Sequence, residues 1–110
     1  MIELQFVPWY TSADIARLVP DDPGVFQVRQ EQLIEYPSGR SAMVYYGAAD
    51  NLRAELLRWV SAQMAEDSGR ILELRFRHCD ELGHMSPQDA LAKLLGRFES
   101  RFGAKPGESP

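Results

Sequence analysis

The chain is predicted to fold as one α+β domain, in which helices flank a small three-stranded sheet and an extra strand and a short helix precede it. Three observations predict this. Apolar residues alternate in some segments, as in strands, and recur at three- and four-residue steps in others, as in helices. Turn-forming Gly, Pro and Ser residues separate these segments. With 110 residues, the chain is long enough for one core and too short for two ordinary domains.

The N-terminal segment is predicted to form the extra strand and the short helix. Residues 2–7 alternate apolar and polar side chains, which is typical of a half-buried strand. A short helix is expected over residues 12–18, because Thr11 and the residue after it are good caps and Pro20 stops it. Its inward residues are expected to be Ile15, Leu18 and Val19.

Two strands joined by a tight turn are predicted next. Residues 24–36 and 41–46 are rich in β-branched and aromatic residues, and the Pro-Ser-Gly-Arg sequence at 37–40 supplies the turn. Residues 50–65 then change to helical spacing, with Asp50 as the expected N-cap. The inward residues of this helix are expected to be Leu52, Leu56, Trp59, Val60 and Met64.

A third strand and a last helix complete the predicted domain. Residues 71–76 alternate, with Leu72, Leu74 and Phe76 on one face. Ser86 and Pro87 open a helix that Gly103 is placed to end. Its apolar stripe consists of Leu91, Leu94, Leu95, Phe98 and Phe102. The domain is expected to span residues 1–106, with its core at about 23–106 and a mobile tail at 107–110.

Composition excludes some classes of function. The formal net charge is −4, so the whole chain is not expected to attract polyanions, and nucleic-acid binding would need a local patch. Cys79 is the only cysteine, which excludes an internal disulfide and fits a reducing compartment. There is no basic leader and no apolar run long enough to span a membrane, so we expect a cytoplasmic protein without a membrane partner. The sequence carries no signal about oligomeric state.

Two short motifs give the chain a family resemblance. Gly24-Val25-Phe26 follows Pro23, and Tyr45-Tyr46-Gly47 leads into the sequence Ala-Ala-Asp-Asn-Leu. Together with Leu56 and the final Lys105-Pro106, these motifs resemble the GIY-YIG nuclease superfamily. The resemblance covers roughly residues 23–106 and implies a three-stranded antiparallel sheet flanked by helices.

The resemblance also implies where a nuclease site would lie. In the family, two motif tyrosines, a helix arginine and a metal-binding glutamate assist phosphodiester hydrolysis. Tyr45 keeps the second tyrosine, but Phe26 replaces the first and Glu55 stands where the arginine is expected. Arg58 lies one helical turn further and is the substitute cation. Glu99 is the candidate ligand for Mg2+ or Mn2+ if the site is active.

These substitutions lead to two hypotheses. The first is a binding or interaction module on a GIY-YIG-like scaffold, with lost or weakened catalysis and no required cofactor. The alternative is a divalent-metal-dependent endonuclease that hydrolyses phosphodiesters of structured DNA or RNA. The partner would be a nucleic acid or a protein.

Several residues are candidates for binding. Tyr46 and Trp59 are expected to line an aromatic concavity beside the motif strands. Arg75, Arg77 and Arg97 are predicted to form a small positive patch, although they also fit ordinary solvated charges beside nearby glutamates. His78, Cys79, Asp80 and His84 are potential metal ligands, but their spacing matches no zinc signature.

Overall fold

The two motif segments form the hairpin at the centre of the fold. The computed structural model describes residues 3–107, and it shows three antiparallel strands in the order β2-β1-β3. Strand β1 (Gly24–Tyr36) pairs with β2 (Gly39–Ala49) on one side and with β3 (Arg75–Cys79) on the other. The predicted α+β class is thus confirmed, but the turn consists of residues 37–38 only, because residues 39 and 40 already pair with β1, and β2 extends beyond the predicted 41–46 at both ends.

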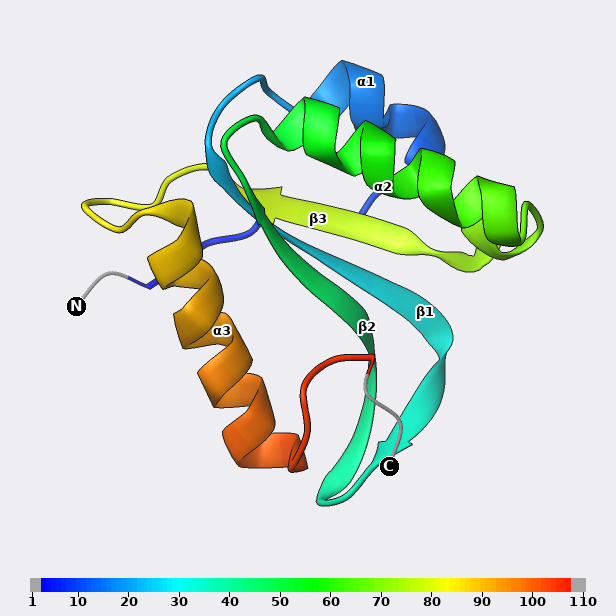
Figure 1. Ribbon diagram of the computed structural model, residues 1–110, viewed down its shortest axis with the longest axis vertical. Helices are drawn as coiled ribbons and strands as arrows, with labels where there is room; N and C mark the ends of the chain where they lie inside the picture. Colours follow the sequence, from blue (N-terminus) through cyan, green and yellow to red (C-terminus); the bar gives the residue numbers. More distant parts are fainter. Residues whose placement is uncertain (1–2, 108–110) are drawn as a thin grey trace.

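The helices cover the two faces of this sheet (Figure 1). Helices α1 (Ile15–Leu18) and α2 (Leu52–Glu66) lie on one face, with a core that includes Phe26, Val28 and Phe76. Helix α3 (Pro87–Phe102) lies on the other face. Its core includes Val25, Cys79, Ala90 and Leu94, with Tyr46 packed against it. We call these the α2 face and the α3 face of the sheet.

Two irregularities divide the β1-β2 hairpin. Val28 pairs with Tyr45 but Arg29 pairs with Met43, so Val44 is an extra residue in β2. Further along, residues 30–33 of β1 lie opposite the single residue Ala42 of β2. The motif end of the hairpin and its turn end are therefore paired in different registers.

The N-terminal segment does not form the predicted strand within the described residues. Val7 donates to the His78 carbonyl at 3.1 Å, and Tyr10 and Phe76 exchange two bonds of 2.8 Å, as an isolated bridge beside β3. Pro8 lies between these contacts and has no N–H, so it interrupts a continuous ladder. The segment is an extended strap along the edge of the sheet.

The short helix follows as a 3₁₀ turn (Ser12–Asp14) that continues into α1. Ile15 and Val19 are buried as expected, but Leu18 is 43% exposed. Thr11 occupies the N-cap position without making a side-chain cap bond, so the predicted capping interaction is absent there. With only four residues, α1 presents too short a face to bury all three apolar side chains.

Helix α2 is confirmed with corrections at its start and end. The N-cap is Asn51, whose side chain accepts from the Ala54 N–H at 3.0 Å, and the expected Asp50 cap is wrong by one residue. Met64, which was predicted to point inward, is 50% exposed.

The third strand begins later than predicted. Residues Arg70–Glu73 form a 3₁₀ turn before β3, and this turn breaks the alternation expected for 71–76. Leu72 is consequently 77% exposed, while Leu74 and Phe76 are fully buried.

Helix α3 starts and ends as predicted. The Ser86 hydroxyl accepts from the Asp89 N–H at 3.1 Å, and Gly103 ends the helix with a φ of 81°. After the helix the chain crosses to the hairpin, where the Gly107 N–H donates to the Tyr36 hydroxyl at 3.0 Å. Gly107, the first residue of the predicted tail, thus contacts the hairpin, and residues 108–110 lie outside the described part. Among residues 3–107, no helix combines the length and apolar character that crossing a membrane needs.

Candidate functional site

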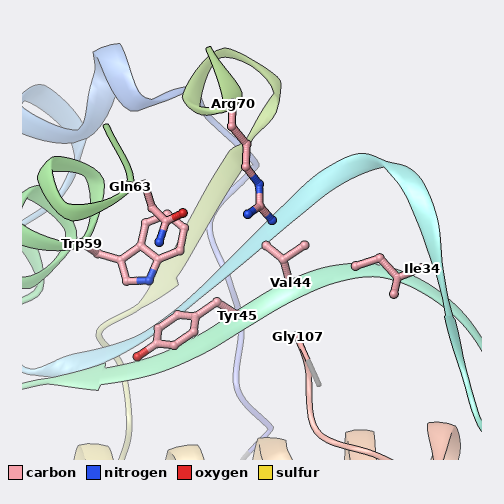
Figure 2. Close-up of a pocket in the computed structure, with 7 residues that line it drawn as sticks. All are labelled: Ile34, Val44, Tyr45, Trp59, Gln63, Arg70 and Gly107. Carbon is pink, nitrogen blue, oxygen red and sulfur yellow. The ribbon is translucent and has the colours of Figure 1, made fainter. Parts of the chain in front are cut away.

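A pocket on the α2 face combines aromatic, apolar and polar walls. It has a volume of about 440 Å³ and we call it the α2-face pocket (Figure 2). In Figure 2, the side chains of Trp59 and Gln63 project from α2 toward the strand that carries Val44 and Tyr45, and Arg70 extends toward Val44. The lining residues are Ile34, Val44, Tyr45, Trp59, Gln63, Arg70 and Gly107.

The extra residue in β2 explains how two consecutive side chains reach this pocket. In a regular strand, neighbouring side chains point to opposite faces. At the irregularity opposite Val28, however, both Val44 and Tyr45 line the α2-face pocket. The bulge thus adds an apolar wall beside the motif tyrosine.

Four aromatic rings form a continuous row from the motif strands to β3. The ring centroids of Phe26 and Tyr45 are 5.8 Å apart, those of Tyr45 and Trp59 are 5.6 Å apart, and those of Trp59 and Phe76 are 5.9 Å apart. Such spacings are those of favourable aromatic pairs. Phe26 and Phe76 are fully buried, whereas Tyr45 is 38% exposed. Of the two motif positions, only Tyr45 can therefore meet a ligand.

Gly47 allows Phe26 to occupy its buried position. The two residues are direct partners across the hairpin, and the Phe26 ring lies where a side chain at position 47 would project. Any Cβ at this position would collide with the ring. The motif glycine thus serves the packing of the phenylalanine that replaces the motif tyrosine.

The charge near Tyr45 is already paired. Glu55 and Arg58, one turn apart on α2, form an ion pair through both guanidinium Nε and Nη2. The hydrogen bond and the charge of Glu55 raise the pKa of the Arg58 guanidinium, and Tyr45 adds a smaller effect in the same direction. The substitute cation Arg58 is thus paired with Glu55, the residue that stands where the resemblance predicts an arginine.

Two polar residues of the pocket were not predicted. Arg70 begins the 3₁₀ turn before β3, and Gln63 lies one turn beyond Trp59 on α2. No motif marks either residue, because Arg70 reaches the pocket only through the turn that brings the chain back to the sheet. Gln63 is recognisable in retrospect from its four-residue spacing to Trp59.

Tyr46 does not share a concavity with Trp59, contrary to the prediction. Its ring packs on Phe98 of α3, with centroids 5.6 Å apart, on the opposite face of the sheet. Burial raises the pKa of its hydroxyl to about 12, although the charge of Arg77 acts in the opposite direction. Tyr45 and Tyr46 point to opposite faces because they are neighbours in a strand.

The candidate metal ligand is also separated from Tyr45. Glu99 and Arg97 are exposed residues of α3, so the sheet lies between them and the α2-face pocket. Within residues 3–107, no three His, Cys, Asp or Glu side chains are grouped to hold a metal ion. Of the sequence-predicted nuclease residues, the structure brings together Tyr45 and Arg58 but not Glu99.

The predicted positive patch has a different composition from the one expected. Arg75 and Arg77 lie on the α3 face of β3, where the direct partner of Arg75 is Arg29 of β1 and the direct partner of Arg77 is Gln27, while Arg97 belongs to α3. The Arg77 Nε donates to the Gln27 side chain at 2.7 Å, and both Arg77 and Arg29 stack on Trp9. The patch is thus formed by two strands and the N-terminal strap.

Two of the possible metal ligands, His78 and Cys79, lie within β3 and have other roles. His78 is buried on the α2 face, and its Nδ1 is 2.7 Å from the Tyr10 hydroxyl. Burial lowers the pKa of His78, so the neutral ring is favoured, while Asp80 acts in the opposite direction. Cys79 is buried on the α3 face. These side chains hold the N-terminal strap and the core.

Comparison of the chain with protein families, curated proteins and solved structures finds no match.

Proposed function

We propose that the chain is a non-catalytic binding module on a GIY-YIG-like scaffold, and that its α2-face pocket binds a small ligand with a planar ring and a negatively charged group. The observation that carries the proposal is the composition of the pocket walls. Tyr45 and Trp59 offer aromatic surface, and Gln63 and Arg70 offer hydrogen-bond donors beside it. Ligand sites of this size are typically apolar and aromatic with a few polar groups that fix orientation.

The same pocket supports binding better than phosphodiester hydrolysis. Charge that develops on a phosphate in the transition state needs unpaired cations placed against it. Arg58 is bound to Glu55, and Phe26 has neither a hydroxyl nor exposure. Glu99 belongs to α3, which lies on the opposite face of the sheet. The residues that would have to converge on one phosphate are thus dispersed or neutralised.

The proposal is tested with anilinonaphthalenesulfonate, a fluorescent probe that carries planar rings and one anionic group. We expect saturable binding of one probe per chain. The Arg70→Gln variant should bind about tenfold more weakly, because a hydrogen bond between charged groups is lost. Arg40→Gln is the matched control, since Arg40 lies at the turn end of the hairpin and pairs with Glu35.

Equal affinity in the Arg70→Gln and Arg40→Gln variants would contradict the proposed pocket. Thermal unfolding of each variant is recorded in parallel, because the probe also binds partly unfolded chains. A cooperative transition like that of the parent chain shows that the native state is being measured.

A second candidate function is the metal-dependent endonuclease. The observation that favours it is that Tyr45 and Arg58 lie within electrostatic reach of each other, as two parts of a nuclease site would. It is tested by incubating the purified protein with Mg2+ or Mn2+ and branched, nicked or single-stranded DNA. We expect no cleavage above background. Cleavage that Tyr45→Phe abolishes would replace the binding proposal with this one.

A further inference from the structure

Three arginines lie together on the α3 face of the central and edge strands. Arg29 of β1 is the direct partner of Arg75 of β3, and Gln27 is the direct partner of Arg77. Direct partners in an antiparallel pair have Cα atoms about 4.5–5.5 Å apart. Because side chains alternate along a strand, Arg29, Arg75 and Arg77 all project from the face opposite the buried Phe76 ring.

This arrangement of like charges is not compensated by carboxylates. Within residues 3–107, the ion pairs involve Arg17, Arg40, Arg53 and Arg58. No carboxylate is within ion-pair distance of Arg29, Arg75 or Arg77 in that part of the chain. Like charges directly opposite each other in a sheet are destabilising. The chain has more acidic than basic residues, with a net charge of −4, yet none of the acidic residues pairs with this cluster. An unpaired cluster of this kind is expected where an anionic ligand supplies the missing negative charge.

The guanidinium groups are held in position before any ligand arrives. Those of Arg29 and Arg77 lie 4.3 Å and 4.4 Å from the centroid of Trp9, and Arg77 also contacts the ring of Phe6. The Arg75 Nη1 donates to the carbonyls of Leu72 and Leu74, which leaves its Nε and Nη2 free of those bonds. Side chains fixed in this way lose less entropy on binding.

A pocket of about 340 Å³ opens beside two of these arginines, and we call it the arginine pocket. Three of the residues that line it, Gln30, Glu31 and Ala42, belong to the irregular part of the hairpin. The lining residues are Arg29, Gln30, Glu31, Ala42 and Arg75. Glu31 is exposed, and its carboxylate is the one acidic group among them. It limits the charge of the pocket without pairing either arginine.

We propose that the arginine pocket binds a phosphate monoester dianion through Arg29 and Arg75. A guanidinium presents a planar fork of N–H donors that matches two oxygens of a phosphate, and two forks match a dianion. Arg77 acts as a positioning residue, because it holds Trp9 in place and its charge adds to the positive potential without lining the pocket.

The surroundings favour recognition of the phosphate group over recognition of a nucleic-acid strand. Proteins that bind single strands present free aromatic faces on which bases stack. Here the ring of Trp9 already stacks with two guanidinium groups, and none of the residues that line the pocket is aromatic. The site is therefore distinct in position and in chemistry from the α2-face pocket.

The test follows the Nε–Hε signals of the arginine side chains by NMR at about pH 8, where phosphate monoesters are dianions. Inorganic phosphate, adenosine monophosphate and adenosine are titrated separately, with sodium chloride keeping the ionic strength constant. We expect saturable shifts of Arg29 and Arg75 with both phosphates and none with adenosine. Tighter binding of the nucleotide identifies a nucleotide ligand, and equal binding identifies the phosphate group alone as the recognised feature.

Three variants separate binding from stability. Arg75→Gln should weaken phosphate binding at least about tenfold while the protein stays at least as resistant to heat, because a like-charge contact is removed. Arg29→Lys keeps the charge but loses the planar fork, so it should also weaken binding. Arg17→Gln, an exposed arginine paired with Asp14, is the control and should leave binding unchanged.

The proposal is overturned if chloride reproduces the shifts, if adenosine binds as well as its monophosphate, or if Arg75→Gln binds like Arg17→Gln. Failure here leaves the α2-face pocket unaffected, since Arg70 and the arginine pocket lie on different faces of the sheet.

Discussion

The α2 face and the α3 face of the sheet differ in how they use aromatic and cationic side chains. On the α2 face, the rings of Phe26, Tyr45 and Trp59 stack on one another, and the nearby Arg58 is paired with Glu55. On the α3 face, Tyr46 and Phe98 also form a ring pair, but Trp9 stacks with cations, and Arg29 and Arg77 have no acidic partner in the described chain. Phe26 and Glu55, which stand where the family resemblance expects catalytic residues, thus serve packing and an ion pair, and the cluster of unpaired arginines lies on the opposite face.

The largest expected effect comes from removing the ring at the base of the aromatic row. Phe26→Ala should lower the free energy of unfolding by about 3–5 kcal/mol, because a fully buried ring leaves a cavity. Urea unfolding measures the loss. Phe26→Leu is the matched control and should retain most of the stability. A loss below about 1 kcal/mol for the alanine variant would mean that Phe26 is not a packing residue.

Restoring the family tyrosine should cost less and should gain no activity. In Phe26→Tyr the added hydroxyl enters the fully buried site of the ring, beside Gly47. An unsatisfied buried hydroxyl costs about 1–3 kcal/mol. Urea unfolding and the DNA cleavage assay are run on the same preparation. Cleavage by this variant would show that only one side chain separates the α2 face from a nuclease site.

Acid should loosen the strap that carries Trp9. The pKa of His78 is lowered by burial, so below its ordinary value of 6.5 the unfolded chain binds a proton that the folded chain does not. The free energy of unfolding is then at its maximum above about pH 6.5 and decreases as the pH falls toward the pKa of His78 in the folded chain. The decrease should be about 1 kcal/mol if one hydrogen bond is lost. Urea unfolding at a series of pH values measures the loss, and His78→Gln should lack this part of it.

A substitution in the arginine cluster should increase stability, in contrast to the losses predicted above. Arg75→Gln removes one of two directly opposed positive charges, so the free energy of unfolding should rise by about 0.2–1 kcal/mol. The rise should shrink in high salt, which screens the repulsion in the parent chain. A destabilised variant with unchanged salt dependence would indicate that the bonds from Arg75 to Leu72 and Leu74 outweigh the repulsion.

The smallest stability change is expected for Glu55→Gln, because exposed ion pairs contribute little. Its effect on binding is more informative. The substitution frees Arg58 beside Tyr45, so an anionic aromatic probe should bind the α2-face pocket more tightly. Unchanged affinity would place Arg58 outside the reach of the pocket and would sharpen the contrast between the two faces.

Local patterns were sufficient for the elements whose ends are marked by single residues. Helix α3 begins at the Ser86 cap and ends at Gly103. The hairpin turn lies within the Pro-Ser-Gly-Arg sequence that predicted it. The prediction of an N-terminal strand was wrong, because alternation of side chains does not show whether the backbone can form a continuous series of hydrogen bonds. Pro8 prevents such a series here. The 3₁₀ turn at Arg70–Glu73 similarly hid the true start of β3.

The candidate sites were less predictable, because they depend on pairing between distant segments. Trp59 lines a pocket as predicted, but its aromatic neighbour there is Tyr45, which was predicted as a catalytic residue, and not Tyr46. Arg75 and Arg77 were chosen with the wrong partner, because only the β1-β3 register shows that Arg29 stands opposite Arg75. Trp9 joins them through an edge contact that no periodicity encodes.

The irregular stretch at residues 30–33 has a consequence for how related chains can vary. Because the pairing on its two sides is set independently, an insertion or deletion there leaves the partners of Val25 to Val28 unchanged. The same stretch supplies Gln30 and Glu31 to the rim of the arginine pocket. A change of length at this point would therefore alter the arginine pocket but leave the α2-face pocket unchanged. The binding properties of the two faces of the sheet could thus change independently of each other.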